Sequence, residues 1–190
     1  VHFKLLIPST RNSENEILAT LILRSLNFIS PDTFAVKTKI NGVHSVMLFQ
    51  ETARKELIEK NNRRESALFE GDEKLLWSYK NFELLGLSSL SLARMTNKNW
   101  LLKGKSSAKI SLYSFSRLQA SHIDSVGNII RPNKEETSDF NNFAFLLLAM
   151  NGYHGLAIHN RKYFFNAIAS KFEPVYYDGN VLFSELGTNT

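Results

Sequence analysis

The residues best suited to chemistry lie in two short stretches of the second half of the chain. Segment 153–162 carries His154, His159 and Asn160, and segment 178–180 begins with Asp178. Imidazole and carboxylate groups can accept protons, and carboxylate and amide oxygens are the ligands that Mg²⁺ prefers. Loops held by rigid elements concentrate catalytic groups, so these two stretches form our candidate site.

Simpler roles exist for the same residues, and several other chemistries lack support. An isolated His is most often a structural hydrogen-bonding residue, and Asp-Gly-Asn is most often only a turn. A zinc site is rejected because His154 and His159 are five apart and no third soft ligand lies nearby. The sequence also has neither a Gly-x-Ser-x-Gly nucleophile motif nor a P-loop motif, so the hypotheses of a hydrolase and of a P-loop protein have no support.

Composition sets the outer limits of the molecule. The 190 residues are 43% hydrophobic, enough for one domain or two small lobes with a buried core. The net charge of +5 is a moderate basic bias, and the lack of cysteine excludes disulfides, thiolate metal sites and a Cys nucleophile. The longest apolar run, 143–150, is too short to cross a bilayer. We therefore expect no membrane span and, with no secretory signal, a cytoplasmic location.

Local patterns predict the elements that position the site. The β-rich segment 1–7 ends at Pro8 and predicts a strand, and apolar residues at helical spacing after Asn12 or Ser13 predict a helix. The runs 34–40 and 46–49 flank Asn41-Gly42, the strongest short-range signal for a β-hairpin.

The rest of the chain follows the same logic. Segment 52–61 predicts a charged helix, 73–85 and 107–119 predict helical pieces, and 131–137 predicts an exposed loop. An apolar helix is expected over 139–150. Two short strands, 163–165 and 175–177, are expected to bracket a turn at 167–171.

The order of these elements fits phosphoryl transfer. A kinase needs a strand Lys, a helix Glu that positions it, a hinge strand, a catalytic loop with an Asn, and a later Asp for metal. This chain has these groups in the same order. They are Lys4, Glu16, the strand segment 46–51 that would lead into the hinge, the loop 154–160 and Asp178.

Several short motifs make the comparison more specific. They are Asn15-Glu-Ile-Leu, Leu26-Asn-Phe-Ile-Ser-Pro, Ile40-Asn-Gly, Leu48-Phe-Gln-Glu and Phe172-Glu-Pro-Val-Tyr-Tyr-Asp-Gly-Asn. Together they resemble the CotH family of atypical, spore-coat-type kinases. In that family a helix ends before a Pro, a strand turns at Asn-Gly, the next strand ends in an acidic residue, and a late Pro-x-x-Asp carries metal.

The resemblance implies an ATP- and Mg²⁺-dependent phosphotransferase with an α+β, protein-kinase-like fold. Residues 1–51 would form a small antiparallel sheet lobe, and residues 52–190 a mainly helical lobe of the same unit. The acceptor would be a hydroxyl of an unknown protein, sugar or lipid.

The resemblance also implies roles for individual residues. Asp178 would bind the metal, and Asn160 or His159 would be the loop ligand to a second metal. Lys4 and Glu16 would form the phosphate-positioning ion pair. Gln50 and Glu51 would border the adenine.

Two departures from the kinase pattern keep alternatives open. His154 stands where a catalytic Asp is expected, with no carboxylate between Asn151 and Arg161, although a neutral His can accept a hydroxyl proton. No Gly-rich hairpin precedes Lys4 and little chain follows Asp178, so we expect a kinase-like core with both ends pared down.

The first alternative is a catalytically inactive kinase-like binding or scaffold module. The second is a basic nucleic-acid binder that uses Arg63-Arg64, segment 98–109 and Arg161-Lys162. The lysines of that segment lack the aromatic neighbours that stack on bases, so we expect no nucleic-acid partner.

Overall fold

The computed structural model describes residues 2–71, 93–123 and 134–183. It shows an α+β protein with two antiparallel sheets, which confirms the predicted class. The strands are β1 (Phe3–Leu6), β2 (Thr33–Ile40), β3 (Val43–Glu51), β4 (Leu68–Gly71), β5 (Ala93–Met95), β6 (Lys162–Asn166) and β7 (Lys171–Val175). The helices are α1 (Ser13–Ser25), α2 (Lys55–Lys60), α4 (Lys98–Leu101), α5 (Lys105–Ile123) and α6 (Lys134–Ala149), with 3₁₀ turns η1 (Pro8–Thr10), η4 (Tyr153–Leu156) and η5 (Ile158–Asn160).

The first sheet has the strand order β1-β3-β2 and contains the predicted hairpin. Ile40 pairs with Val43 across a two-residue turn whose residues, Asn41 and Gly42, have φ angles of 51° and 84°. Both positions need positive φ, which Asn and Gly tolerate best. The hairpin prediction is therefore confirmed.

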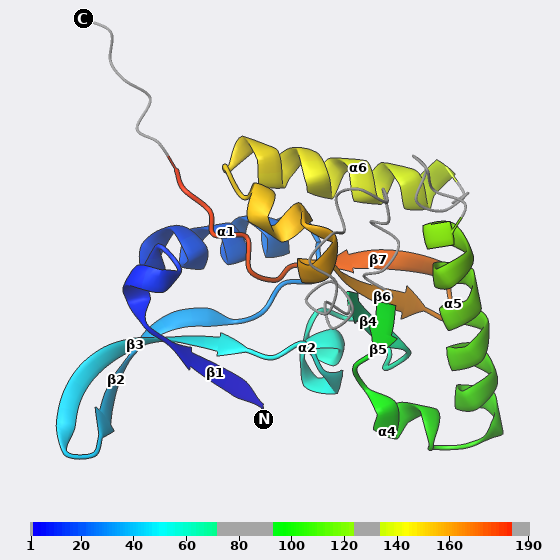
Figure 1. The fold of residues 1–190 in the computed structure, drawn as a ribbon, viewed down its shortest axis with the longest axis horizontal. Coiled ribbons are helices and arrows are strands. Elements are labelled where there is room, and N and C mark those ends of the chain that lie inside the picture. The colour runs from blue at the N-terminus through cyan, green and yellow to red at the C-terminus, as the bar shows by residue number, and fades with distance from the viewer. Residues whose placement is uncertain (1, 72–92, 124–133, 184–190) are drawn as a thin grey trace, which may run out of the picture.

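The predicted first helix is α1, and it links the first sheet to the rest of the molecule. Glu14 and Glu16 lie in its first turn, where negative side chains interact favourably with the positive end of the helix dipole. Its buried residues Ala19 and Leu23 pack in one core with Phe143, Leu147, Met150, Tyr176 and Val181. Figure 1 shows α1 between the first sheet and α6.

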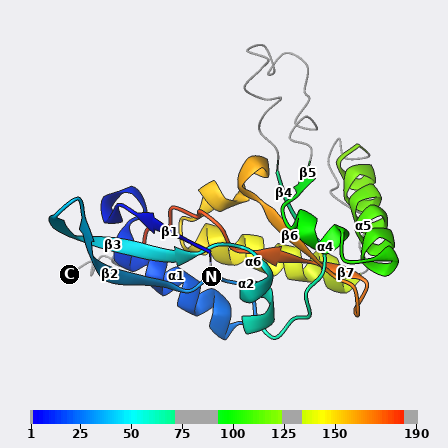
Figure 2. The same ribbon diagram turned by 90° about the horizontal axis from the view of Figure 1, so that it is seen from below.

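The second sheet has the order β5-β4-β6-β7 and lies with α5 at the other end of the molecule from the β2–β3 hairpin (Figure 1 and Figure 2). Successive side chains of β6 point to opposite faces of the sheet, so this strand contributes to two cores. Tyr163 and Phe165 pack in the core that includes Leu118 of α5, whereas Phe164 packs with α2 residues. The sequence predicts a mainly helical second part, and the structure adds a four-stranded sheet to it.

The segments before and after residue 51 share buried cores. Ile29, which precedes β2, packs with Leu57 and Ile58 of α2 and forms a parallel bridge to Val175. The boundary expected at residue 51 falls between β3 and α2, and the chain on both sides of it contributes to these cores.

Two local predictions are wrong. Residues 134–137 belong to the first turn of α6 instead of a loop, because the buried Glu136 accepts a hydrogen bond from the Phe172 N–H at 2.6 Å and pairs with Arg117. The last strand covers 171–175 instead of 175–177, because Val175 pairs with Lys162, where β6 begins; residues 176–178 follow β7 outside the sheet.

Other predictions are confirmed with shifted bounds. Helix 52–61 is the shorter α2, and helix 107–119 lies within α5. The piece 73–85 and residues 131–133 lie outside the described residues. No helix in the described ranges has the length and apolar character needed to span a membrane.

Candidate functional site

Three consecutive residues after β7 organise the candidate site. The Tyr176 hydroxyl donates to Glu16 Oε2 at 2.7 Å, and the Tyr177 hydroxyl accepts from Lys4 Nζ at 2.7 Å. Asp178 forms an ion pair with Arg11 and lies beside His154. Segment 176–178 therefore joins groups from β1, the η1–α1 region and turn η4.

Glu16 is the buried support of this segment. Its side chain is fully enclosed, and Gln50 Nε2 donates to its Oε1 at 2.9 Å. Burial raises the pKa of the Glu16 carboxyl, while the hydrogen bonds from Tyr176 and Gln50 oppose that rise. Burial, followed by the nearby Glu16, raises the pKa of the Tyr176 hydroxyl, which therefore stays protonated as a donor.

Lys4 faces the solvent side of the same segment. Its ammonium lies 4.7 Å from the centre of the Tyr177 ring, and the ammonium of Lys162 lies 4.2 Å from it. A cation over an aromatic face is attracted by the ring quadrupole, so Tyr177 holds two positive charges at one place.

The ion pair expected between Lys4 and Glu16 is not formed. Both Glu16 oxygens are occupied by the neutral donors Gln50 and Tyr176 inside the core. The Lys4 side chain is exposed, and its ammonium stays at the surface on Tyr177. Two adjacent tyrosines thus replace the direct contact.

Asp178 is buried and has a left-handed backbone, with φ of 48°. Asp and Asn tolerate this conformation better than most residues. The Arg11 guanidinium contacts its Oδ1, and His154 Nε2 lies 3.8 Å from its Oδ2.

The turns η4 and η5 place the histidine segment against Asp178. Asn160 Nδ2 donates to the His154 carbonyl at 3.1 Å, and the His154 and His159 rings lie 6.4 Å apart. A Cβ on Gly155 would come within 3.2 Å of Gly179 Cα, so glycine allows the two loops to approach closely.

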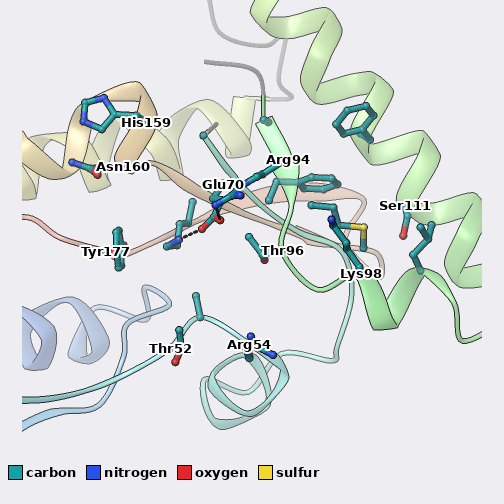
Figure 3. A pocket seen from close by; sticks show the side chains of 18 of the residues that line it. Thr52, Arg54, Glu70, Arg94, Thr96, Lys98, Ser111, His159, Asn160 and Tyr177 are labelled. Atoms are coloured by element: carbon teal, nitrogen blue, oxygen red, sulfur yellow. Dashed lines mark hydrogen bonds and ion pairs between the residues drawn. The ribbon is translucent and has the colours of Figure 1, made fainter. Parts of the chain in front are cut away.

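Lys4, Tyr177, His159 and Asn160 border an open cleft of about 1310 Å³. Figure 3 shows His159, Asn160 and Tyr177 at one end, and Lys98 and Ser111 at the other. Among the described residues the lining has a single acidic side chain, Glu70, against the cations Lys4, Arg54, Arg94, Lys98 and Lys162. Such a cleft attracts anions.

The structure brings most of the predicted site residues together. Lys4, His159 and Asn160 line the cleft. His154 and Asp178 do not line it; the His154 carbonyl accepts from Asn160, and Asp178 lies beside His154.

Gln50 and Glu51 do not line the cleft, contrary to the expected adenine border. Gln50 points inward to Glu16, and Glu51 Oε2 accepts from the Asp32 N–H at 3.4 Å. Burial raises the pKa of the Glu51 carboxyl, and the charge of Arg24 opposes it. The next residues, 52–54, line the cleft instead.

Sequence reasoning missed Arg11 and the two tyrosines as site residues. Arg11 and Asp178 are far apart in the chain, so no local spacing marks their contact. The only local signal is the adjacency of Tyr176, Tyr177 and Asp178.

Three of the basic residues of the nucleic-acid alternative are engaged in ion pairs. Arg63 Nη2 lies 2.9 Å from Glu173 Oε2, Lys103 pairs with Glu65, and Lys162 pairs with Glu70. These three side chains are therefore not free cations.

Two side chains of this region carry oxygen donors. Within the described residues no three His, Asp or Glu side chains gather into a group that could hold a metal by themselves. Mg²⁺ commonly uses one or two carboxylates together with substrate phosphates. Asp178 has a carboxylate, which Arg11 contacts, and the Asn160 amide oxygen has no hydrogen bond to the described residues.

No protein-family model matches this chain, and a search of curated proteins finds no match either.

Proposed function

We propose that this chain is an ATP- and Mg²⁺-dependent phosphotransferase of the atypical, CotH-like kinase type. The observation that supports it most is the convergence of Lys4, Glu16 and the histidine turn on residues 176–178. A kinase-like fold would bring together a strand Lys, a helix Glu and a metal-binding Asp in this way.

The nucleotide phosphates bind at the end of the cleft that carries Tyr177. Lys4 and Lys162 present two ammonium groups there. Phosphoryl transfer depends mainly on positioning and on neutralising charge, which these groups supply without bond-making chemistry of their own.

Asp178 and the amide oxygen of Asn160 would hold the metal, which would neutralise phosphate charge when bound. Arg11 contacts the Asp178 carboxylate, so its guanidinium would have to move for Asp178 to serve as a ligand.

The reaction transfers the γ-phosphoryl group to a hydroxyl. The acceptor oxygen bonds to the γ-phosphorus, the bond from that phosphorus to the bridging oxygen breaks, and ADP leaves. The hydroxyl proton passes to an imidazole. The sequence predicts His154, beside Asp178, as this acceptor, and His159 is the histidine that lines the cleft. A largely dissociative transition state demands little of this base.

A second candidate is an inactive kinase-like module that binds nucleotide without turnover. The observation that favours it is the ion pair of Asp178 with Arg11, which occupies the proposed metal ligand. The turn 152–160 also contains no carboxylate.

A thermal-shift and transfer experiment tests the proposal. We expect ATP with Mg²⁺ to raise the melting temperature of the wild type, and we expect Asp178→Asn to abolish this rise. Asn is chosen because it tolerates the left-handed backbone conformation of residue 178. Asp139→Asn is the matched control, because Asp139 pairs with Lys171 at 2.8 Å and does not line the cleft.

The outcomes separate the candidates. A shift with γ-phosphate transfer to a mixed protein acceptor supports the phosphotransferase. A shift without transfer to any protein, sugar or lipid acceptor favours the inactive module. No shift with any nucleotide refutes both.

A further inference from the structure

The cleft is larger than a nucleotide requires. Pockets for small ligands measure about 300–1,000 Å³, and this cleft measures about 1310 Å³. If the phosphates occupy the Tyr177 end, the end formed by α4, α5 and the segment before α2 remains for a second molecule (Figure 3).

Within the described residues, cations outnumber acidic side chains at that second end. Glu70 lies between the two ends and binds Lys162 on one side and Arg94, at 2.7 Å, on the other. Arg54 and Lys98 have no acidic partner among the described residues, and both side chains are exposed. Two cations without an acidic partner in the described part of the chain favour an anionic occupant.

The wall beside these cations is apolar. Leu102 after α4 is 79% exposed and Leu112 of α5 is 64% exposed, and both line the cleft. Exposed leucines next to cations suit a chain that carries both acidic and apolar side chains.

We propose that the Arg54–Lys98 end of the cleft binds the phosphate acceptor, and that this acceptor is an acidic peptide segment carrying a serine or threonine hydroxyl. The inference rests on the proposed function, since it assigns the acceptor of that reaction. A single-stranded nucleic acid fits less well because the most exposed apolar side chains of this wall, Leu102 and Leu112, are aliphatic, and base stacking needs aromatic faces.

Peptide binding can be measured without turnover. The probe is a fluorescein-labelled peptide in which serine alternates with glutamate, compared with serine–lysine and serine–glycine peptides, in the presence of Mg²⁺ and a non-hydrolysable ATP analogue. We expect the acidic peptide to bind more tightly than both others. The double variant Arg54→Glu with Lys98→Glu should weaken it by about tenfold or more.

A matched double variant controls for net charge. Lys37 and Lys39 are exposed on β2 and do not line the cleft, so Lys37→Glu with Lys39→Glu changes the charge equally elsewhere. We expect this variant to keep its peptide affinity. Both double variants should keep the nucleotide thermal shift, which also reports that they are folded.

Three results would overturn the inference. The first is equal affinity for the acidic and glycine peptides, and the second is an equal loss of peptide affinity in both double variants. The third is an oligothymidine that binds more tightly than the acidic peptide and whose binding is weakened by the same cleft variant. A wild-type protein that binds the acidic peptide through Arg54 and Lys98 but shows no nucleotide shift would refute the proposed function and leave the peptide site supported.

Discussion

Replacing Glu16 tests the buried support of the site. Glu16→Ala would leave the Tyr176 hydroxyl and the Gln50 amide without their acceptor inside the core. Each of the two buried groups left unpaired costs about 1–3 kcal/mol, so we expect a loss of about 2–6 kcal/mol in the free energy of unfolding. Glu16→Gln keeps an acceptor for Tyr176, and Gln50 can turn its amide to meet the new one, so we expect a loss of about 1 kcal/mol or less.

The same pair of variants gives a pH dependence with a defined sign. The Glu16 pKa in the folded protein is raised above its ordinary value of 4.5, mainly by burial. Folding therefore favours the protonated acid. Its contribution to stability is fully present below about pH 4.5 and is lost as pH rises through the folded pKa. Relative to Glu16→Gln, the wild type should lose stability over that window, by at most about 1.4 kcal/mol per pH unit.

Urea unfolding followed by circular dichroism, from about pH 4 to about pH 8, measures both effects. The Glu16→Ala variant should also lose affinity for nucleotide, because Tyr176 no longer fixes the segment that carries Tyr177 and Asp178. A loss below about 1 kcal/mol in Glu16→Ala would refute the role of the buried network. A wild-type advantage over Glu16→Gln that grows with pH would refute the sign of the pKa argument.

Two further substitutions probe the loop that carries Asp178. In Gly179→Ala the new Cβ would lie 2.6 Å from the Tyr176 hydroxyl, so we expect a loss of about 1–3 kcal/mol in urea unfolding, whereas Gly104→Ala, which meets nothing within 4 Å, should stay within about 0.5 kcal/mol. Equal effects of the two would contradict the close approach. Arg11→Gln removes the cation that shares the Asp178 carboxylate, so less Mg²⁺ should be needed for half of the nucleotide thermal shift; an unchanged or higher requirement would show that Arg11 does not compete with the metal.

Local signals predicted the parts of the fold that depend on local physics. Asn41-Gly42 fixed the hairpin because both turn residues need positive φ, and the apolar spacing after Asn12 predicted α1. The prediction of a loop at 134–137 was wrong because Glu136 binds Phe172 of β7 and Arg117 of α5, contacts that the local sequence does not show. Strands β4 and β5 are short, and pairing within the second sheet, which local patterns do not reveal, defines them.

The candidate site shows the same division. Residue types and order placed Lys4, Asn160 and Asp178 in one region, where the structure finds them around Tyr177 and His154. The way they are held was not predictable, because each contact joins residues that lie far apart in the chain. Tertiary packing, and not spacing, decides that Glu16 binds a tyrosine instead of a lysine.

Isothermal titration calorimetry with ATP tests the central claim most directly. In the presence of Mg²⁺ we expect one nucleotide site per chain, with weaker binding in Lys4→Gln and no binding in Asp178→Asn, while Asp139→Asn binds like the wild type. Removing Mg²⁺ should weaken binding to the wild type. Binding that is absent from the wild type, or that is unaffected by both Lys4→Gln and Asp178→Asn, would contradict a nucleotide site organised by residues 176–178.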